Sequence, residues 1–194
     1  MFKVLHNDPF SSHQECMLIG LFDKPEKFTG TLEPLDDYFQ GELTELVKLG
    51  DVSAKLKSVS VVHSLGRTNM KRLVFVGLGK EKELRFDQLK EAFGIAFKQT
   101  KAMKVKSLSV SLDSFCTERL AEVDVAHALS EAYALATYEF AHYKQKSNEP
   151  DVEVDTFDVF THADQSEIKA ALFVGDTLGI GTNCARTLVN IPEI

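Results

Sequence analysis

Long hydrophobic runs, cysteine pairs and an excess of basic charge are all missing from this sequence. No stretch approaches the roughly 18 consecutive apolar residues of a membrane-spanning helix, and the N-terminus has no apolar core followed by a small-residue cleavage site. Neither secretion nor a membrane span is therefore expected. The three cysteines, Cys16, Cys116 and Cys184, are too far apart for a disulfide framework or a Cys-x-x-Cys motif. A cytoplasmic protein fits this pattern best.

Basic residues are outnumbered by acidic ones. The chain has 22 Lys and Arg against 29 Asp and Glu, a net charge of −7 and an isoelectric point near 5.4. This balance argues against a protein built to neutralise nucleic-acid phosphates. One basic cluster exists, formed by Lys98, Lys101, Lys104 and Lys106. Because no aromatic or arginine residues are interleaved, the cluster indicates a solvated helix face or a helix end.

Sequence motifs of hydrolytic or metal chemistry are also absent. The six histidines show no His-x-x-x-His or His-Glu-x-x-His spacing, and Ser64 and Ser114 lack a Gly-x-Ser-x-Gly elbow. Acidic groups at Asp36–Asp37 and Glu153–Asp158 are expected to face solvent. The sequence therefore offers no candidate catalytic or metal-binding residue.

Short apolar runs alternate with helical patterns along the chain. Strands are predicted at 17–22, 58–63, 73–78, 108–112 and 152–160. The runs at 17–22 and 73–78 are continuously apolar, which indicates strands covered on both faces. The alternation at 108–112 indicates one more polar face. A mixed sheet follows.

Apolar residues repeat near every 3.6 positions in four further segments. Helices are predicted at 38–47, 89–100, about 118 to about 142, and from near 164 towards 188. Phe93 lies on the apolar stripe of the second, and glycines at 175, 179 and 181 are where the last helix could be interrupted. A polar cluster at 145–151 is expected to be a linker or hairpin. Strands alternating with helices imply an α/β domain with helices on both faces of the sheet.

Two glycines, Gly77 and Gly79, lie at the carboxyl end of the strand predicted at 73–78. Open α/β sheets bind ligands at this edge, so a phosphate site is one interpretation. The third glycine of a dinucleotide fingerprint and the Gly-x-x-x-x-Gly-Lys-Ser/Thr pattern are both absent. We therefore favour tight-turn glycines after a buried strand.

Three segments, taken in order, resemble one protein family. They are Lys-Arg-Leu-Val-Phe-Val-Gly-Leu-Gly-Lys at 71–80, Tyr-Glu-Phe-Ala-His-Tyr-Lys at 138–144, which closes the long third helix, and Arg-x-Leu-Val-Asn-x-Pro at 186–192. Together they resemble the N-terminal domain of the leucyl aminopeptidases, the cytosolic two-metal exopeptidases. Thr187 stands where an aspartate is frequent in the family, and Glu193–Ile194 stands where many members have Pro-Asn or Gly-Asn.

The resemblance implies a macro-domain-like three-layer α/β fold, a mixed sheet with helices on both faces. It implies an N-terminal domain over residues 1–182 and, over 183–194, the start of a linker to a C-terminal catalytic domain missing from this chain. In the family, that domain uses two divalent metal ions (Zn or Mn) to remove N-terminal amino acids from peptides. The present chain is then predicted to be inactive alone, with no catalytic, cofactor-binding or metal-binding residue.

The same resemblance implies partners as well. They are the chain's own C-terminal domain and, in the full-length protein, further copies in a cytoplasmic hexamer, where this domain would serve assembly or access control. Neither a membrane nor a nucleic acid is expected as a partner. Two alternatives stay open: a free-standing macro-like module for ADP-ribose or a related nucleotide, with Asp23 and Gly77–Gly79 as candidate residues, and a purely structural interaction domain.

Overall fold

One mixed sheet organises the computed structural model, which describes residues 2–23, 32–140 and 154–191. Its spatial order is β1-β6-β5-β2-β4-β3. The strands are β1 (Phe2–Leu5), β2 (Cys16–Phe22), β3 (Val59–His63), β4 (Arg72–Gly79), β5 (Ser107–Ser111) and β6 (Thr156–Phe160). All neighbours run parallel except β3, which is antiparallel to β4. The mixed sheet expected from the sequence is confirmed.

The sequence pattern missed one strand. β1 pairs in parallel with β6, with Val4 opposite Val159, and forms one end of the sheet. Only four residues long, β1 is too short for its alternation to be distinguished from a loop. β6 begins at Thr156; Val154 and Asp155, which were expected to belong to it, have no regular secondary structure, and residues 152–153 lie outside the described residues.

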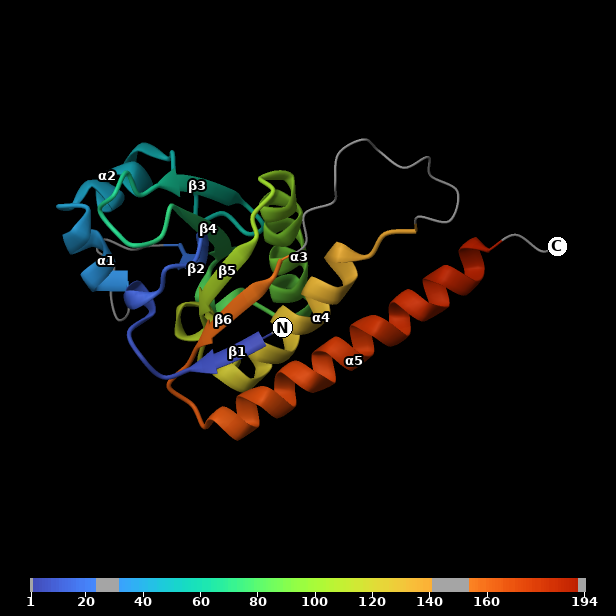
Figure 1. Ribbon diagram of the computed structural model, residues 1–194. Coiled ribbons are helices and arrows are strands. Elements are labelled where there is room, and N and C mark those ends of the chain that lie inside the picture. Colours follow the sequence, from blue (N-terminus) through green and yellow to red (C-terminus); the bar gives the residue numbers. More distant parts are fainter. Residues whose placement is uncertain (1, 24–31, 141–153, 192–194) are drawn as a thin grey trace.

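Helices cover both faces of the sheet (Figure 1). The α-helices are α1 (Glu33–Tyr38), α2 (Glu42–Leu49), α3 (Phe86–Ala102), α4 (Glu122–Thr137) and α5 (Gln165–Asn190), with short 3₁₀ turns at Pro9–Ser11 (η1), Glu81–Glu83 (η3) and Leu112–Phe115 (η4). Figure 1 places α3, α4 and α5 on one side of the sheet and α1 and α2 on the other. This is the three-layer α/β arrangement that the sequence predicted.

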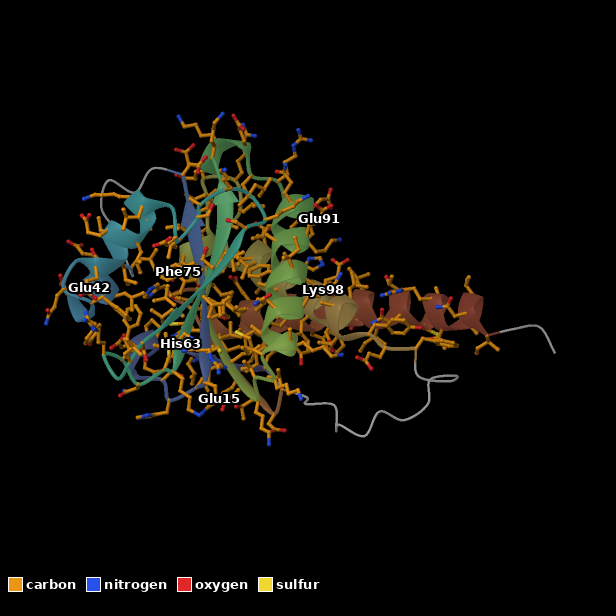
Figure 2. The ribbon with its side chains drawn as sticks, turned by 90° about the horizontal axis from the view of Figure 1, so that it is seen from above. Glu15, Glu42, His63, Phe75, Glu91 and Lys98 are labelled. Carbon is orange, nitrogen blue, oxygen red and sulfur yellow. The ribbon has the colours of Figure 1, made fainter. Side chains whose placement is uncertain are left out.

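Each face of the sheet has its own apolar core. Phe93 and Phe97 of α3 pack with Phe157 of β6 on the α3–α5 side. Met17 of β2 and Phe75 of β4 are buried on the side covered by α1 and α2, where Figure 2 labels Phe75. The continuously apolar runs of β2 and β4 are thus explained, since successive side chains enter opposite cores.

Strand β5 was expected to have a more polar face. Its three serines do share one face, yet Ser109 and Ser111 are buried and Ser107 is half-buried. Ser109 Oγ donates to the Cys16 carbonyl at 3.4 Å, and Ser111 Oγ bonds the Asp113 carboxylate. Alternation here marks hydrogen-bonded serines inside the protein rather than a solvent-facing side.

Two predicted helices have different limits in the structure. The segment expected at 38–47 is two helices, because Gln40 and Gly41 take positive φ angles of 56° and 83° and break the run between α1 and α2. The helix expected at about 118–142 spans only Glu122–Thr137. Its C-cap, Tyr138, is extended, so the aromatic string from Tyr138 onward does not close the helix. Residues 141–144 of that string lie outside the described residues, as does the polar cluster at 145–151.

α5 is not interrupted at its glycines. Asp164 caps its N-terminus by accepting hydrogen bonds from the Ser166 and Glu167 amides at 2.8 Å and 3.2 Å. The helix then continues to Asn190. Gly175 and Gly179 do not break it; they are the positions at which it packs closely on α4. α5 therefore crosses residues 182 and 183 without a break, and the domain boundary placed there stays a prediction.

Candidate functional site

The carboxyl end of β4, where a phosphate site was considered, is occupied by the chain's own backbone. The N–H groups of Gly77 and Gly79 donate to the carbonyls of Ser58 and Ala54, both at 2.8 Å. The Gly77 carbonyl in turn accepts from the Lys57 N–H at 2.8 Å. Both glycine amides are thus satisfied within the protein and are not free to bind a diphosphate.

The two glycines are required by close approach. A Cβ at Gly77 would fall closer than 3.0 Å to the Lys55 carbonyl and to Ser58 Oγ. Gly79 has a φ of +67°, which favours glycine. The interpretation as turn glycines after the strand was wrong about their position, because both lie within β4. The segment at 54–58 that packs on them was not predicted.

A small hollow lies beside this edge. Its volume is about 250 Å³, and it is lined by Asp23, Lys55, Leu56, Leu78, Gly79, Lys80, Glu83, Leu84 and Gln88. Lys80 Nζ donates to Glu83 Oε1 at 2.8 Å, and this hydrogen bond raises the pKa of the lysine. The two lysines are balanced by Asp23 and Glu83, so the hollow has no excess positive charge for a diphosphate.

The adjacent strand end is closed in a similar way. Gly20 of β2 donates its N–H to Ser114 Oγ at 3.0 Å, and Ser114 Oγ donates to the Ser111 carbonyl at 2.8 Å. A Cβ at Gly20 would collide with the Ser114 carbonyl. The η4 turn therefore packs directly on β2. Ser64, the other serine considered from the sequence, is buried in the β3–β4 connection and bonds the Met70 carbonyl.

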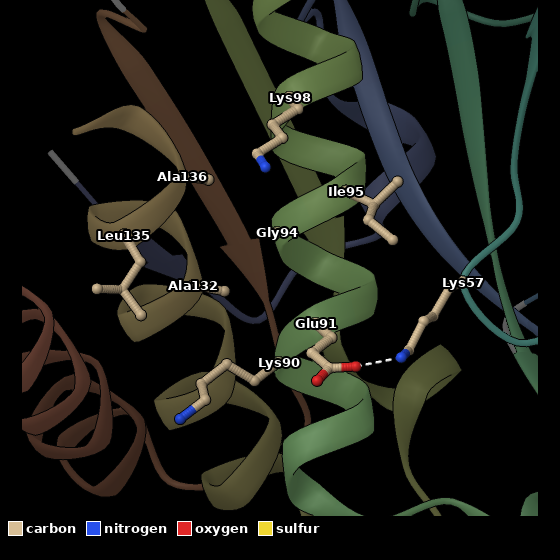
Figure 3. A pocket seen from close by; sticks show the side chains of 9 residues that line it. All are labelled: Lys57, Lys90, Glu91, Gly94, Ile95, Lys98, Ala132, Leu135 and Ala136. Carbon is tan, nitrogen blue, oxygen red and sulfur yellow. Dashed lines mark ion pairs between the residues drawn. The ribbon is translucent and has the colours of Figure 1, made fainter. Parts of the chain in front are cut away.

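A larger hollow lies on the surface along α3 and α4 (Figure 3). This α3–α4 groove has a volume of about 380 Å³. It is lined by Lys57, Lys90, Glu91, Gly94, Ile95, Lys98, Ala132, Leu135 and Ala136. Figure 3 shows the ion pair between Lys57 and Glu91, and Lys90 pairs with Glu131 at 2.8 Å. Two of its three lysines are thus paired with glutamates, and the remaining lining is largely apolar, so the groove shows no clear excess of positive charge.

The basic cluster spans the end of α3 and the connection to β5. Lys98 and Lys101 lie on α3, and Lys101 pairs with Glu139. Lys104 follows the helix with a φ of 55°, and the Lys106 N–H donates to Glu15 Oε2 at 2.9 Å. Lys101 in the last turn fits the expected helix end.

Of the acidic residues expected to face solvent, Asp37 and Asp155 are exposed, Asp36 and Asp158 are not, and Glu153 lies outside the described residues. Asp36 accepts hydrogen bonds from the Thr44 amide at 3.2 Å and hydroxyl at 2.5 Å, which joins α1 to α2. Asp158 is buried on β6 and accepts from Gln14 Nε2 at 2.7 Å. Both carboxylates hold local structure. A carboxylate or serine in a sequence pattern cannot reveal a partner that lies far away along the chain.

Among residues 2–23, 32–140 and 154–191, no group of three or more His, Cys, Asp or Glu side chains could hold a metal ion. Burial raises the pKa of Cys16, and burial with nearby carboxylates raises that of Cys116 to about 12. Cys184 is exposed on α5. No helix within the described part of the chain is long and apolar enough to cross a bilayer.

These features define a three-layer α/β domain whose strand ends are covered by its own backbone. A model of the cytosol aminopeptidase family, N-terminal domain, matches residues 18–147. The match covers more than half of the chain. The chain therefore belongs to the cytosol aminopeptidase family, in which it corresponds to the N-terminal domain.

Individual relatives agree with this assignment. The chain is 44% identical over 182 residues to the probable cytosol aminopeptidase of Bacillus subtilis (strain 168), a match that covers 94% of this chain and 36% of the relative. A mutant of tomato leucine aminopeptidase matches with a TM-score of 0.81 at 19% identity, over 98% of this chain and 38% of that one. The chain thus spans slightly more than a third of these aminopeptidases.

The macrodomain of Thermus aquaticus DarG has the same fold. It matches with a TM-score of 0.60 at 11% identity, over 83% of this chain and 98% of that one. The macro-domain-like fold expected from the sequence is confirmed by this similarity.

Proposed function

We propose that this chain is the non-catalytic N-terminal domain of a metal-dependent cytosol aminopeptidase. Its chemistry, the removal of N-terminal amino acids from peptides, would belong to a C-terminal region beyond the matched third of the relatives. The observation that carries the proposal is the family match over residues 18–147, supported by 44% identity to the Bacillus subtilis protein. Two divalent ions, Zn or Mn, would activate water and stabilise the developing charge in that region.

The proposed role of the domain itself is assembly or access control in a cytoplasmic hexamer. A domain on the periphery of such an assembly can limit which peptides reach the catalytic region without contributing a catalytic group. As part of the same proposal, this chain contributes no catalytic, cofactor-binding or metal-binding residue.

A second candidate function is the binding of ADP-ribose or a related nucleotide, favoured by the macrodomain architecture. The geometry at β4 opposes it. The backbone amides of Gly77 and Gly79 already donate to Ser58 and Ala54, and the hollow beside them is balanced in charge. We therefore rank this function second.

The full-length protein provides the test. We expect it to release p-nitroaniline from leucyl p-nitroanilide in the presence of Zn²⁺ or Mn²⁺, and to lose activity when the metal is chelated. Removal of residues 1–190, which takes away α5 as a whole, should leave the metal requirement intact while altering assembly size or the preference for short over long peptides. A full-length protein with no aminopeptidase activity on any metal would contradict the proposal.

A further inference from the structure

The two ends of the sheet differ in how they are protected from further strand pairing. β1, at one end, has only four residues, and its Lys3 is exposed. β3, at the other end, has five residues, Val-Ser-Val-Val-His, without proline, lysine, arginine or a carboxylate. Natural edge strands usually carry such residues, or are very short, to prevent pairing with another chain. β3 therefore has the sequence of a strand that accepts a neighbour.

The outer side of β3 presents free backbone groups. Among the described residues, β3 pairs only with β4. The Ser64 N–H donates to the Lys71 carbonyl at 3.0 Å, and hydrogen-bonded pairs recur at every second residue of an antiparallel ladder. The alternate residues, Val59, Val61 and His63, therefore direct their N–H and C=O groups away from β4.

An apolar surface continues from β3 onto α3. Val59 and Val61 are half-buried on the side of the sheet that α3 covers. Ile95 of α3 is 40% exposed, and Figure 3 shows it on the flank of the helix that faces Lys57, away from α4. Residues 59–63 and Ile95 are here called the β3 edge.

We propose that the β3 edge pairs with the β3 edge of a second copy of this chain, an inference that rests on the assembly role proposed above. The two strands would run antiparallel about a two-fold axis at Val61, with each Val59 opposite His63 of the second copy. The outward groups would then exchange hydrogen bonds in pairs, and the six-stranded sheet would continue into that of the second copy. The two Ile95 side chains would lie over the valines at the junction.

Charge favours a second copy as the partner. A two-fold axis brings a strand against its own counterpart, so a charged strand would repel itself. The only titratable residue of β3 is His63, and it would face Val59 rather than another histidine. Lys57, just before the strand, is already paired with Glu91, so this pair adds no net charge beside the junction. The surface that covers the β3 edge is thus the β3 edge itself.

Amide exchange in the 194-residue chain tests the pairing directly. In a dilute, monomeric sample the Val61 amide should exchange rapidly, while the Val62 amide, directed to β4, should be protected. At concentrations where sedimentation gives twice the monomer mass of 21.6 kDa, exchange at Val61 should slow by at least about tenfold. Exchange at Val62 should change little. NMR of the isotope-labelled chain measures both amides.

Two exposed apolar side chains provide a matched pair of substitutions. Ile95→Lys puts an ammonium group of each copy beside the junction, whereas Leu49→Lys changes a side chain that is 75% exposed at the end of α2, on the other side of the sheet. Ile95→Lys should raise the Kd of the dimer at least about tenfold, because like charges meet across the axis. Leu49→Lys should leave the Kd unchanged.

A third substitution acts on the backbone. Val61→Pro removes an outward N–H and no bond to β4, so it should abolish the dimer. Circular dichroism establishes whether each variant is folded, and Ile95→Lys decides the matter if Val61→Pro is not.

Three results would overturn the inference. They are a wild-type chain that stays monomeric at its highest soluble concentration, a dimer in which the Val61 amide exchanges as fast as in the monomer, and a Val61 amide that is protected in the monomer. An active full-length aminopeptidase whose assembly is unaffected by Ile95→Lys keeps the proposed function and removes this contact. Loss of assembly with Ile95→Lys in a full-length protein without aminopeptidase activity supports the contact and contradicts the function.

Discussion

Gly175 of α5 lies directly against Ser130 of α4: a Cβ at position 175 would fall closer than 3.0 Å to Ser130 Oγ. The His127 carbonyl lies equally close. This contact keeps α5 on the body of the domain and explains a glycine in the middle of a 26-residue helix, where glycine is otherwise unfavourable.

The first prediction is that Gly175→Ala destabilises the chain by about 1 to 3 kcal/mol, because α4 and α5 must separate to admit a methyl group. Gly181→Ala on the same helix is the matched control, since nothing lies within 4 Å of a Cβ there. The control should stabilise the chain by up to about 1 kcal/mol through helix propensity. Urea unfolding measures both, and equal effects of the same sign would refute this account of the α4–α5 contact.

The second prediction concerns Phe93, which is fully buried. Its ring centre lies 4.6 Å from that of Phe115 and 6.2 Å from that of Phe97. Phe93→Ala should therefore cost roughly 3 to 5 kcal/mol. Ile95→Ala, two residues along the same helix and 40% exposed, should cost much less. An unchanged unfolding midpoint for Phe93→Ala would show that α3 is not packed on the sheet as described.

The third prediction concerns the end of β4. ADP-ribose at millimolar concentration should leave the melting temperature of the chain unchanged, because the Gly77 and Gly79 amides are already bonded. A ligand at 100 times its dissociation constant would instead add about 2.7 kcal/mol of stability, a shift of several degrees in a chain of this size. A saturable shift in scanning fluorimetry would make nucleotide binding the leading function.

The fourth prediction is a pH dependence that involves Glu15. The Lys106 N–H bonds its carboxylate at 2.9 Å, and Lys71 Nζ lies at 3.2 Å. These groups lower the pKa of the carboxyl below its ordinary 4.5. Because the pKa is lower in the folded state, the carboxylate stabilises the fold above pH 4.5. That contribution disappears as the pH falls through the folded-state pKa.

Glu15→Gln should therefore be less stable than wild type near neutral pH, and the difference should narrow in acid. Glu45→Gln, which removes an exposed pair with Lys48, is the control and should have little effect at either pH. Thermal melts at pH 7 and below pH 4 provide the comparison. A difference in melting temperature between Glu15→Gln and wild type that widens in acid would contradict this prediction.

Strongly periodic segments were predictable from the sequence because their apolar spacing reflects burial directly. The stripe around Phe93 became α3, and the continuous run at 17–22 became β2, with both faces covered. Glycines were harder, because the same residue type breaks a helix at Gly41 and joins two helices at Gly175. Which of these two roles a glycine has depends on the residues that face it in the folded protein.

The candidate site was less predictable than the fold. Gly77 was recognised as a special position, yet its neighbour, the backbone at 54–58, is about 20 residues away along the chain, so no local pattern identified it.

The central claim is that this domain is not itself the catalyst. The most direct measurement is the release of p-nitroaniline from leucyl p-nitroanilide by the purified 194-residue chain, with Zn²⁺, Mn²⁺ or Mg²⁺ added separately. Circular dichroism of the same sample establishes that it is folded. We predict no release above a protein-free blank with any of the three metals. Metal-dependent release that persists through purification and disappears with chelation would contradict the claim.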